Sequence, residues 1–220
     1  LHNRKHSFPT RRSSDLGFAE ESGNSPLVLL GSSTWPGEES LLLQIQAEAQ
    51  RQGWDVRLVL VPRHAERGDA IQSLLEAQAL PWHRRSQSAR AEPGNGIYLA
   101  DTTGELRRFT QVADLAFIGK TLPPHTESQT PIECVAFGVP LVTGPGIGNF
   151  RETLLNLQKT GGCLTGRDAS EVRKMLLQLL ENPQEREMLS EKARQWLMQN
   201  RGSAERTLAA LDQLFFPSHG

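Results

Sequence analysis

The stretch LVLLGSSTWPGEESLLLQIQAEAQRQGWDVRLVLVP, residues 27–62, decides the fold class. Its first apolar run, 27–31, ends in Gly and predicts a short buried strand. The segment 37–53 begins with acidic residues and ends with Gly, which is typical of a helix. A second apolar run, 56–62, ends at a proline and predicts another strand. A strand, a helix and a strand in this order indicate two parallel strands joined by a crossover helix.

The same alternation continues to the end of the chain. Further strands are expected at 96–101, 114–119, 140–144 and 163–164, and further helices at 66–80, 103–113, 130–138, 149–162, 168–182, 183–200 and 203–215. Short apolar strands that alternate with helices indicate a parallel sheet covered on both faces. The predicted fold class is therefore α/β, with a Rossmann-like parallel sheet, helices on both faces and a helical C-terminal end.

Composition limits the kinds of partner. The chain has 220 residues, of which 37% are hydrophobic, and this suffices for one large domain. The net charge of −1 creates no global field that favours nucleic acid. No apolar run reaches the roughly 18 residues that a membrane-spanning helix needs. Two cysteines without zinc-ligand spacing suggest a reducing compartment, and the six scattered histidines predict no metal site.

The N-terminal segment differs from the rest of the chain. Residues 1–16 are polar and basic and show no periodicity. Within them, SFPTRRSSDL (7–16) resembles one reading frame of a common sequencing-library adaptor, so residues 1–16 are expected to be non-native. Residues 17–26 are interpreted as a linker, and the domain is expected to occupy residues 27–220.

Ligands of parallel α/β sheets bind beyond the carboxyl ends of the strands, which makes five loops candidates for a site. The loop after the first strand offers the hydroxyls of Ser33 and Thr34 and the start of a helix, which suit an anion. The alternative is an ordinary helix cap by Ser32, Ser33 or Thr34, with Glu38 and Glu39 complementing the helix dipole.

Arg63 and His64 follow the second strand, where an arginine can pair with a phosphate through two hydrogen bonds. The alternative for these residues is a surface ion pair with Glu66 or another carboxylate, an interaction that usually contributes little to stability. The sequence leaves both interpretations open.

Two further loops have largely structural explanations. After the third strand, Asp101 or Thr102 is placed to cap the next helix, and Glu105 is placed to complete a capping box. After the fifth strand, the glycines of GPGIGNF (144–150) permit a close approach of the backbone.

The loop after the fourth strand, 118–133, is too long and too polar for a mere connection, which favours a functional role. Thr130 as N-cap and Pro131 at the first helical position are a standard helix start. Free N–H groups at such a start can hold a phosphate, and Glu133 can accept hydrogen bonds from ribose hydroxyls. The five loops together predict an anion or nucleotide site without an obvious nucleophile.

Six segments carry a family resemblance: SSTWPGEE, LVPRHAER, RRS (84–86), DTTGELRRFTQVADLAFIGKTL, TPIECVAFGVPLVTGP and NFRE. In this order they resemble the C-terminal half of bacterial 3-deoxy-D-manno-octulosonic acid (Kdo) transferases. The resemblance implies a two-domain glycosyltransferase of the GT-B type. Its C-terminal Rossmann-like domain binds the donor CMP-Kdo, and its N-terminal domain binds the lipid A precursor and supplies a carboxylate as general base.

The chain would then lack the acceptor domain and hold no catalytic residue of its own. The parent enzyme of lipopolysaccharide biosynthesis would act at the cytoplasmic face of the bacterial inner membrane, and its partners would be the CMP-sugar donor and the lipid A precursor, with no nucleic acid. The donor carries one phosphate, so neither a metal ion nor another cofactor is expected.

The resemblance also assigns roles to single residues. Arg63 would meet the phosphate or carboxylate of the donor, Thr130 would lie by the phosphate, and Glu133 would bind the ribose. The remaining positions expected at the donor site are Ser33, Thr34, His64, Thr102, Gly104, Glu105, Gly119, Lys120, Gln129 and Asn149.

The chain departs from the family pattern at several points. Glu127–Thr130 reads ESQT where many members read Gly-Gly-His-Asn, Cys134 replaces a usual proline, and Trp35 stands where His is common. Another GT-B glycosyltransferase, a nucleotide-sugar epimerase, or a nucleotide-binding module without catalysis are the alternatives, because a Rossmann-like domain alone implies no reaction.

Overall fold

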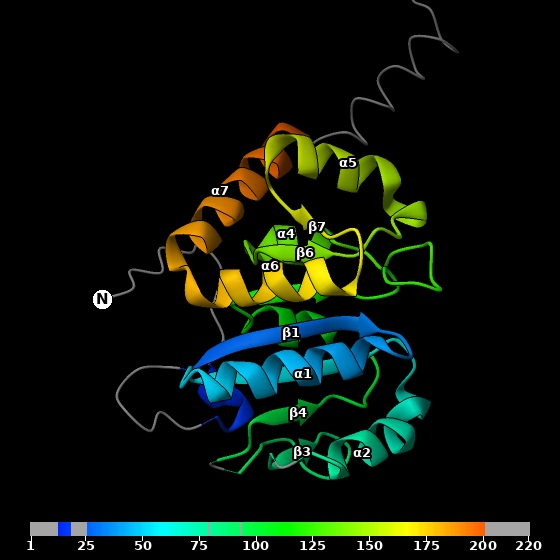
Figure 1. Cartoon of the computed structure of the whole chain (residues 1–220), viewed down its shortest axis with the longest axis vertical. Coiled ribbons are helices and arrows are strands. Elements are labelled where there is room, and N and C mark those ends of the chain that lie inside the picture. Colours follow the sequence, from blue (N-terminus) through cyan, green and yellow to red (C-terminus); the bar gives the residue numbers. More distant parts are fainter. Residues whose placement is uncertain (1–12, 19–25, 79, 93, 201–220) are drawn as a thin grey trace, which may run out of the picture.

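The computed structural model describes residues 13–18, 26–78, 80–92 and 94–200. These residues contain a seven-stranded sheet in the order β3-β4-β2-β1-β5-β6-β7, in which every neighbouring pair is parallel (Figure 1). The strands are β1 (Leu27–Thr34), β2 (Val56–Pro62), β3 (Trp82–Arg84), β4 (Ile97–Leu99), β5 (Leu115–Ile118), β6 (Leu141–Thr143) and β7 (Leu164–Thr165). The predicted α/β class with a Rossmann-like parallel sheet is confirmed.

Helices cover both faces of this sheet. The described α-helices are α1 (Glu38–Arg51), α2 (Gly68–Glu76), α3 (Leu106–Thr110), α4 (Ile132–Phe137), α5 (Arg151–Thr160), α6 (Ala169–Glu181) and α7 (Pro183–Asn200). Short 3-10 turns occur at η1 (Ser13–Leu16), η2 (Ala65–Arg67) and η3 (Gly148–Phe150). In Figure 1, α1 and α6 lie in front of the strands, and α7 runs along the side of the molecule.

The core consists of two apolar layers, one on each face of the sheet. Leu29 of β1 points toward α1, α2 and α6, whereas Val28 and Leu30 point toward α3, α4 and α5. α7 contributes Leu189 to the first layer and Trp196 to the second. Strands buried on both faces read as continuous apolar runs, which is why 27–31 and 56–62 show no alternation with polar residues.

The sequence misses one strand. β3 consists of Trp82, His83 and Arg84 and pairs with β4 alone, with Trp82 opposite Ile97. Its composition is polar and aromatic because it lies at the edge of the sheet, so no apolar run marks it. Helices predicted at 103–113 and 130–138 are the shorter α3 and α4, and the helix predicted at 203–215 lies outside the described residues.

The packed core extends beyond the expected domain start at Leu27. Leu16 and Phe18 are fully buried in the layer that contains Tyr98, and the Phe18 and Tyr98 rings meet edge to face, 6.1 Å apart. Ala91 N–H also donates a hydrogen bond to the Leu16 carbonyl at 2.7 Å. Residues 16–18 therefore pack as part of this domain, and a boundary at Leu27 is too late. The adaptor origin of residues 1–16 stays a prediction.

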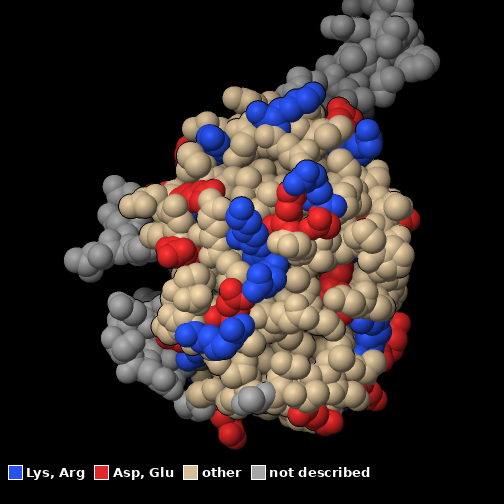
Figure 2. Space-filling view, in the orientation of Figure 1, with Lys and Arg blue, Asp and Glu red and all other residues tan. Residues whose placement is uncertain are grey.

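Acidic and basic side chains are interspersed on the face that carries α1 and α6 (Figure 2). One contact between these two helices is the ion pair of Arg173 on α6 with Glu48 on α1. A mixed surface of this kind offers no continuous basic region for a polyanion on this face.

Candidate functional site

The topological switch point of the sheet lies between β1 and β5. These strands are neighbours, with Ser32 opposite Ile118 at the end of their pairing. The connection after β1 leads to β2 on one side, whereas the connection after β5 leads to β6 on the other side. The two loops therefore diverge at the carboxyl edge, where open α/β sheets bind their ligands.

The backbone is unusual at both strand ends. Ser33 has a φ of 54° and is the extra residue of a bulge, because the register with β2 shifts between Ser32 and Thr34. Gly119 N–H donates to the Ser32 carbonyl at 2.9 Å, and a Cβ on Gly119 would lie 2.3 Å from the Ser33 oxygen. Lys120 follows with a φ of 61°. Non-glycine residues held in this left-handed region cluster at functional sites.

A buried carboxylate joins the two loops. The Glu38 side chain accepts hydrogen bonds from the N–H groups of Trp35, Lys120 and Thr121, each at 2.9 Å, and of Leu122 at 3.2 Å. Burial raises the pKa of Glu38, and the four amide hydrogen bonds oppose that shift by favouring the charged form. Glu38 was expected only to complement the helix dipole, and its burial was not foreseen.

The side chains of Trp35 and Lys120, whose amides bind this carboxylate, belong to an aromatic and cationic cluster. The Trp35 ring meets the His64 and His125 rings edge to face, with centroids 5.3 and 5.2 Å away. Lys120 Nζ lies 4.5 Å from the centroid of the Trp35 ring and forms an ion pair with Glu127. Trp35 Nε1 and His125 Nε2 are buried and have no hydrogen-bond partner among the described residues. Such atoms are suited to a polar ligand or to water.

The glycines after β6 accommodate the loop after β5. Gly146 N–H donates to the Thr121 carbonyl at 2.9 Å and Gly148 N–H donates to the Thr126 carbonyl at 3.0 Å. A Cβ on Gly144 would lie 2.3 Å from the Thr121 oxygen. The predicted close backbone approach is therefore confirmed, and the partner is another loop of the same chain.

The start of α4 differs in detail from the predicted cap. The helix begins at Ile132, whose N–H donates to the Thr130 hydroxyl at 3.3 Å. Glu133 lies in the first turn, and its Oε2 is buried without a hydrogen-bond partner among the described residues. Gln129 is tied to the switch point because its N–H donates to the Gly119 carbonyl at 3.0 Å.

The loop after β4, which lies two strands from β1, is held by ion pairs. Glu105 accepts a hydrogen bond from the Thr102 hydroxyl at 2.5 Å and pairs with Arg85 at 3.0 Å and Arg108 at 3.1 Å. Burial alone would raise the pKa of Glu105, but the hydrogen bonds from Thr102 and Arg85 lower it overall. The predicted capping box is wrong, because the carboxylate is held by these cationic side chains and α3 begins only at Leu106.

Asp101 is likewise engaged with side chains from β3 and the residues after it. Its carboxylate accepts hydrogen bonds from Arg84 Nε at 2.6 Å, Ser86 N–H at 2.9 Å and Ser86 Oγ at 2.7 Å. Asp101 therefore does not cap α3. The role of Arg84 and Ser86 was not predicted, since their edge strand carries no apolar signal.

The remaining predicted residues lie at the same edge with different degrees of contact. Arg63 N–H donates to the Thr34 carbonyl at 3.0 Å, while its side chain is exposed and has no ion-pair partner among the described residues. His64, in contrast, pairs with Glu66 at 3.4 Å, so the alternative of a surface ion pair holds for His64. Asn149 lies exposed in η3, and Gly104 has a φ of 82°.

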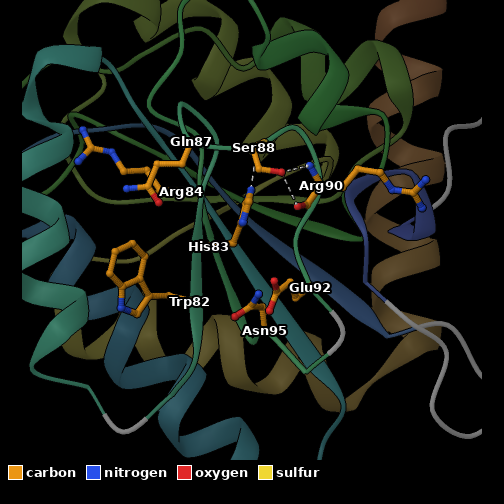
Figure 3. A pocket seen from close by; sticks show the side chains of 8 residues that line it. All are labelled: Trp82, His83, Arg84, Gln87, Ser88, Arg90, Glu92 and Asn95. Atoms are coloured by element: carbon orange, nitrogen blue, oxygen red, sulfur yellow. Dashed lines mark hydrogen bonds between the residues drawn. The ribbon is translucent and has the colours of Figure 1, made fainter.

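A separate pocket of about 320 Å³ lies at the outer edge of the sheet, beside β3 (Figure 3). Figure 3 shows His83 pointing toward Ser88, whose carbonyl lies 2.8 Å from His83 Nε2. None of the predicted donor-site residues lines this pocket. Because three strands separate β3 from β5, the pocket is distinct from the switch point.

Comparison with known protein families gives a match that includes this site. The model of the family described as glycosyl transferases group 1 matches residues 84–196, just over half of the chain. The chain belongs to this family. The match includes the loops after β4, β5 and β6, and therefore much of the switch-point site of this glycosyltransferase domain.

Two curated relatives are named 3-deoxy-D-manno-octulosonic acid transferase. The protein from Bordetella pertussis is 34% identical over 90% of this chain and 47% of its own length. The protein from Haemophilus influenzae is 30% identical over 84% of this chain and 43% of its own length. The predicted resemblance to Kdo transferases is confirmed, and the glycosyltransferase chain spans less than half the length of these relatives.

Solved structures show the same arrangement. The C-terminal CMP-Kdo binding domain of WaaA from Acinetobacter baumannii is 28% identical, with a TM-score of 0.73 over 78% of this chain and 89% of that domain. A glycosyltransferase from Rickettsia africae is only 14% identical, with a TM-score of 0.58 over 90% of this chain and 50% of that one, and it shows the fold alone. The predicted GT-B half is confirmed by the family and the first of these structures.

Within the described ranges, no helix is long and apolar enough to cross a membrane. No group of three or more His, Cys, Asp or Glu side chains among those residues is arranged to hold a metal ion.

Proposed function

We propose that this chain is the donor-binding half of a Kdo transferase and that it binds CMP-Kdo at the switch point between β1 and β5. The observation that carries the proposal is the 28% identity to the CMP-Kdo binding domain of WaaA, at a TM-score of 0.73 over 89% of that domain. The site supports it with groups of suitable chemistry, because an exposed arginine without an ion-pair partner among the described residues and buried polar atoms without hydrogen-bond partners there lie on loops at the carboxyl edge of the sheet.

Arg63 is the residue assigned to the anionic part of the donor. Its side chain is exposed and unpaired within the described residues, so binding a phosphate or carboxylate breaks no existing ion pair. Its backbone is fixed by the hydrogen bond to the Thr34 carbonyl at the end of β1. A guanidinium can form two parallel hydrogen bonds with either anion.

Glu133 and Thr130 are assigned to the nucleoside side of the site. The buried Oε2 of Glu133 has no partner among the described residues, and a ribose hydroxyl can satisfy it. Thr130 lies at the start of the same short helix, and Gln129 is held beside Gly119. Ser33, Thr34 and Lys120 are then assigned to the part of the site nearer β1.

The chain supplies no general base in this proposal. The acceptor hydroxyl attacks the anomeric carbon of Kdo, its proton passes to a carboxylate of an acceptor domain, and the bond to the CMP phosphate breaks as CMP leaves. The acceptor is the lipid A precursor, and the complete enzyme acts at the cytoplasmic face of the bacterial inner membrane. One phosphate in the leaving group fits a site that neutralises charge with side chains, without a metal ion.

The test is nucleotide binding by the purified chain, measured by calorimetry. CMP is expected to bind, and Arg63→Ala is expected to weaken it about 10- to 100-fold, as loss of a charge-assisted hydrogen bond does. Glu133→Gln should weaken CMP as well. Arg51→Ala is the matched control, because Arg51 lies exposed at the far end of α1. Preference for UDP over CMP would favour another glycosyltransferase, and no response to any nucleotide would overturn the proposal.

A further inference from the structure

Glu38 is placed differently from an ordinary acidic residue at the start of a helix. Such residues interact with the helix dipole while they remain in solvent. Glu38 is 1% exposed, and both carboxylate oxygens are used by backbone N–H groups. Three of the four donors come from residues 120–122, more than 80 positions along the chain. The contact therefore connects the loop after β5 to the start of α1.

The four hydrogen bonds require an ionised carboxylate. Two carboxylate oxygens offer about four lone-pair sites, which match four N–H donors. A glutamine of the same length would turn an amide NH₂ toward donors that already point inward. No ion pair to Glu38 occurs among the described residues, so aligned amide dipoles and the N-terminus of α1 compensate the buried charge.

The same contact fixes the conformation of Lys120. Lys120 is a non-glycine residue at a φ of 61°, and its N–H donates one of the four hydrogen bonds that Glu38 accepts. On its N-terminal side, Gly119 N–H is bonded to Ser32, so the backbone of residues 119–122 is held from both β1 and α1. This backbone directs the Lys120 side chain over Trp35 to Glu127. Strained residues persist where their surroundings hold them in this way.

We propose that Glu38 is a positioning residue of the donor site, which holds the amides of Lys120, Thr121 and Leu122 and thereby places the Lys120 side chain at the switch point. The inference rests on the proposed function for its consequence in donor binding. The part that concerns the loop stands on the contacts of Glu38 alone. Glu38 acts through Lys120 and does not touch the donor in this assignment.

The experiment compares Glu38→Gln with Leu43→Ala by NMR-detected amide hydrogen exchange and by CMP calorimetry. Leu43 is buried on the same helix and contributes to the apolar layer, so its truncation lowers global stability without removing a hydrogen bond to the loop. In Glu38→Gln, the amides of Lys120, Thr121 and Leu122 are expected to exchange at least about tenfold faster than in Leu43→Ala at matched global stability. CMP affinity should fall about tenfold in Glu38→Gln and stay unchanged in Leu43→Ala.

Each outcome has one meaning. Glu38 has no positioning role if the amides of residues 120–122 exchange at the same rate in the two variants at matched global stability. The same conclusion follows if the loss of CMP affinity in each variant is proportional to its loss of global stability. If the unsubstituted chain binds no CMP, the proposed function fails, while the exchange comparison still decides what Glu38 holds. Glu38→Asp, which keeps the charge but reaches fewer donors, replaces Glu38→Gln if that variant does not fold, and it is expected to speed exchange at the same three amides.

Discussion

Three buried carboxylates at the carboxyl edge are each stabilised by a different set of donors. Glu38 is held by backbone amides, Glu39 forms an ion pair with Arg67 at 2.8 Å, and Asp101 is held by Arg84 and a serine. A buried carboxylate without such partners would be strongly destabilising. At the residue scale, these contacts show that acidic side chains here hold loops in place.

Asp101→Asn tests this at one position. Burial alone would raise the pKa of Asp101, but hydrogen bonds from Arg84 and Ser86 lower it overall. A carboxyl whose pKa is lower in the folded chain stabilises the fold above its ordinary pKa of about 4, and this contribution is lost as pH falls through the folded value. The variant should be about 1–3 kcal/mol less stable near neutral pH, and the difference should shrink below about pH 4. Urea unfolding from about pH 3 to about pH 7 measures it.

The control for this prediction is Asp69→Asn. Asp69 pairs with the same Arg84 at 2.7 Å, but its side chain is 90% exposed. Exposed ion pairs contribute little, so the control should change stability by less than about 1 kcal/mol. Equal losses in the two variants, or a difference for Asp101→Asn that does not change with pH, would contradict the explanation.

At the scale of elements, the site depends on how closely the ends of β1 and β5 approach. The bulge at Ser33 moves its carbonyl toward the first residue after β5, and only a glycine fits at that position. The loop after β6 approaches the β5 loop in the same way, through Gly144 and Gly146. Three strand ends are therefore joined by backbone contacts that leave no room for side chains.

Gly119→Ala is expected to separate the ends of β1 and β5. The added methyl group would lie 2.3 Å from the Ser33 oxygen and 2.8 Å from the Thr34 Cα, which are backbone atoms that cannot rotate away. The expected loss of stability is about 2–3 kcal/mol, measured by urea unfolding. Gly96→Ala is the control, since its new methyl group would meet the ends of the Gln50 and Gln46 side chains at 3.2 and 3.6 Å and the Pro81 carbonyl only at 3.9 Å. A loss below about 1 kcal/mol is expected there, and an equal loss in both would disprove the clash.

At the scale of the whole molecule, the two apolar layers give the domain one cooperative core. β1 contributes to both layers, and α7 contacts both through Leu189 and Trp196. Both cysteines are free and buried in the second layer, Cys134 on α4 and Cys163 directly before β7. Their accessibility therefore reports whether that layer opens locally or with the entire domain.

Cys134 and Cys163 are expected to react only when the domain unfolds. Burial raises the pKa of each thiol to about 12, so almost no reactive thiolate forms at moderate pH. Iodoacetamide labelling at about pH 8 should be at least about 100-fold slower in the native chain than in urea. Cys134→Ser and Cys163→Ser, each with one remaining thiol, assign the rates. Rapid labelling of either thiol without denaturant would show that the layer opens locally.

Most of the elements, and the edge of the sheet at which a site is predicted, follow from the sequence alone. The apolar run at 27–31, the helix at 37–53 and the second run at 56–62 were sufficient for a parallel α/β sheet, because periodicity is a local property. The positions of Ser33, Gly119 and Lys120 at strand ends followed from the same pattern. The family resemblance then directed attention to Arg63 and Glu133, whose assigned contacts with a donor stay predictions.

Contacts between distant side chains depend on the tertiary structure. Glu38 and Lys120 lie 82 residues apart in the sequence, and no local pattern predicts that one accepts a hydrogen bond from the other. The local pattern assigns Glu105 to a helix cap, whereas in the folded chain it pairs with Arg85, from the turn after β3. Pairing of this kind depends on strand order and on burial. It arises when distant segments exclude water together, and a periodicity confined to one segment carries no record of it.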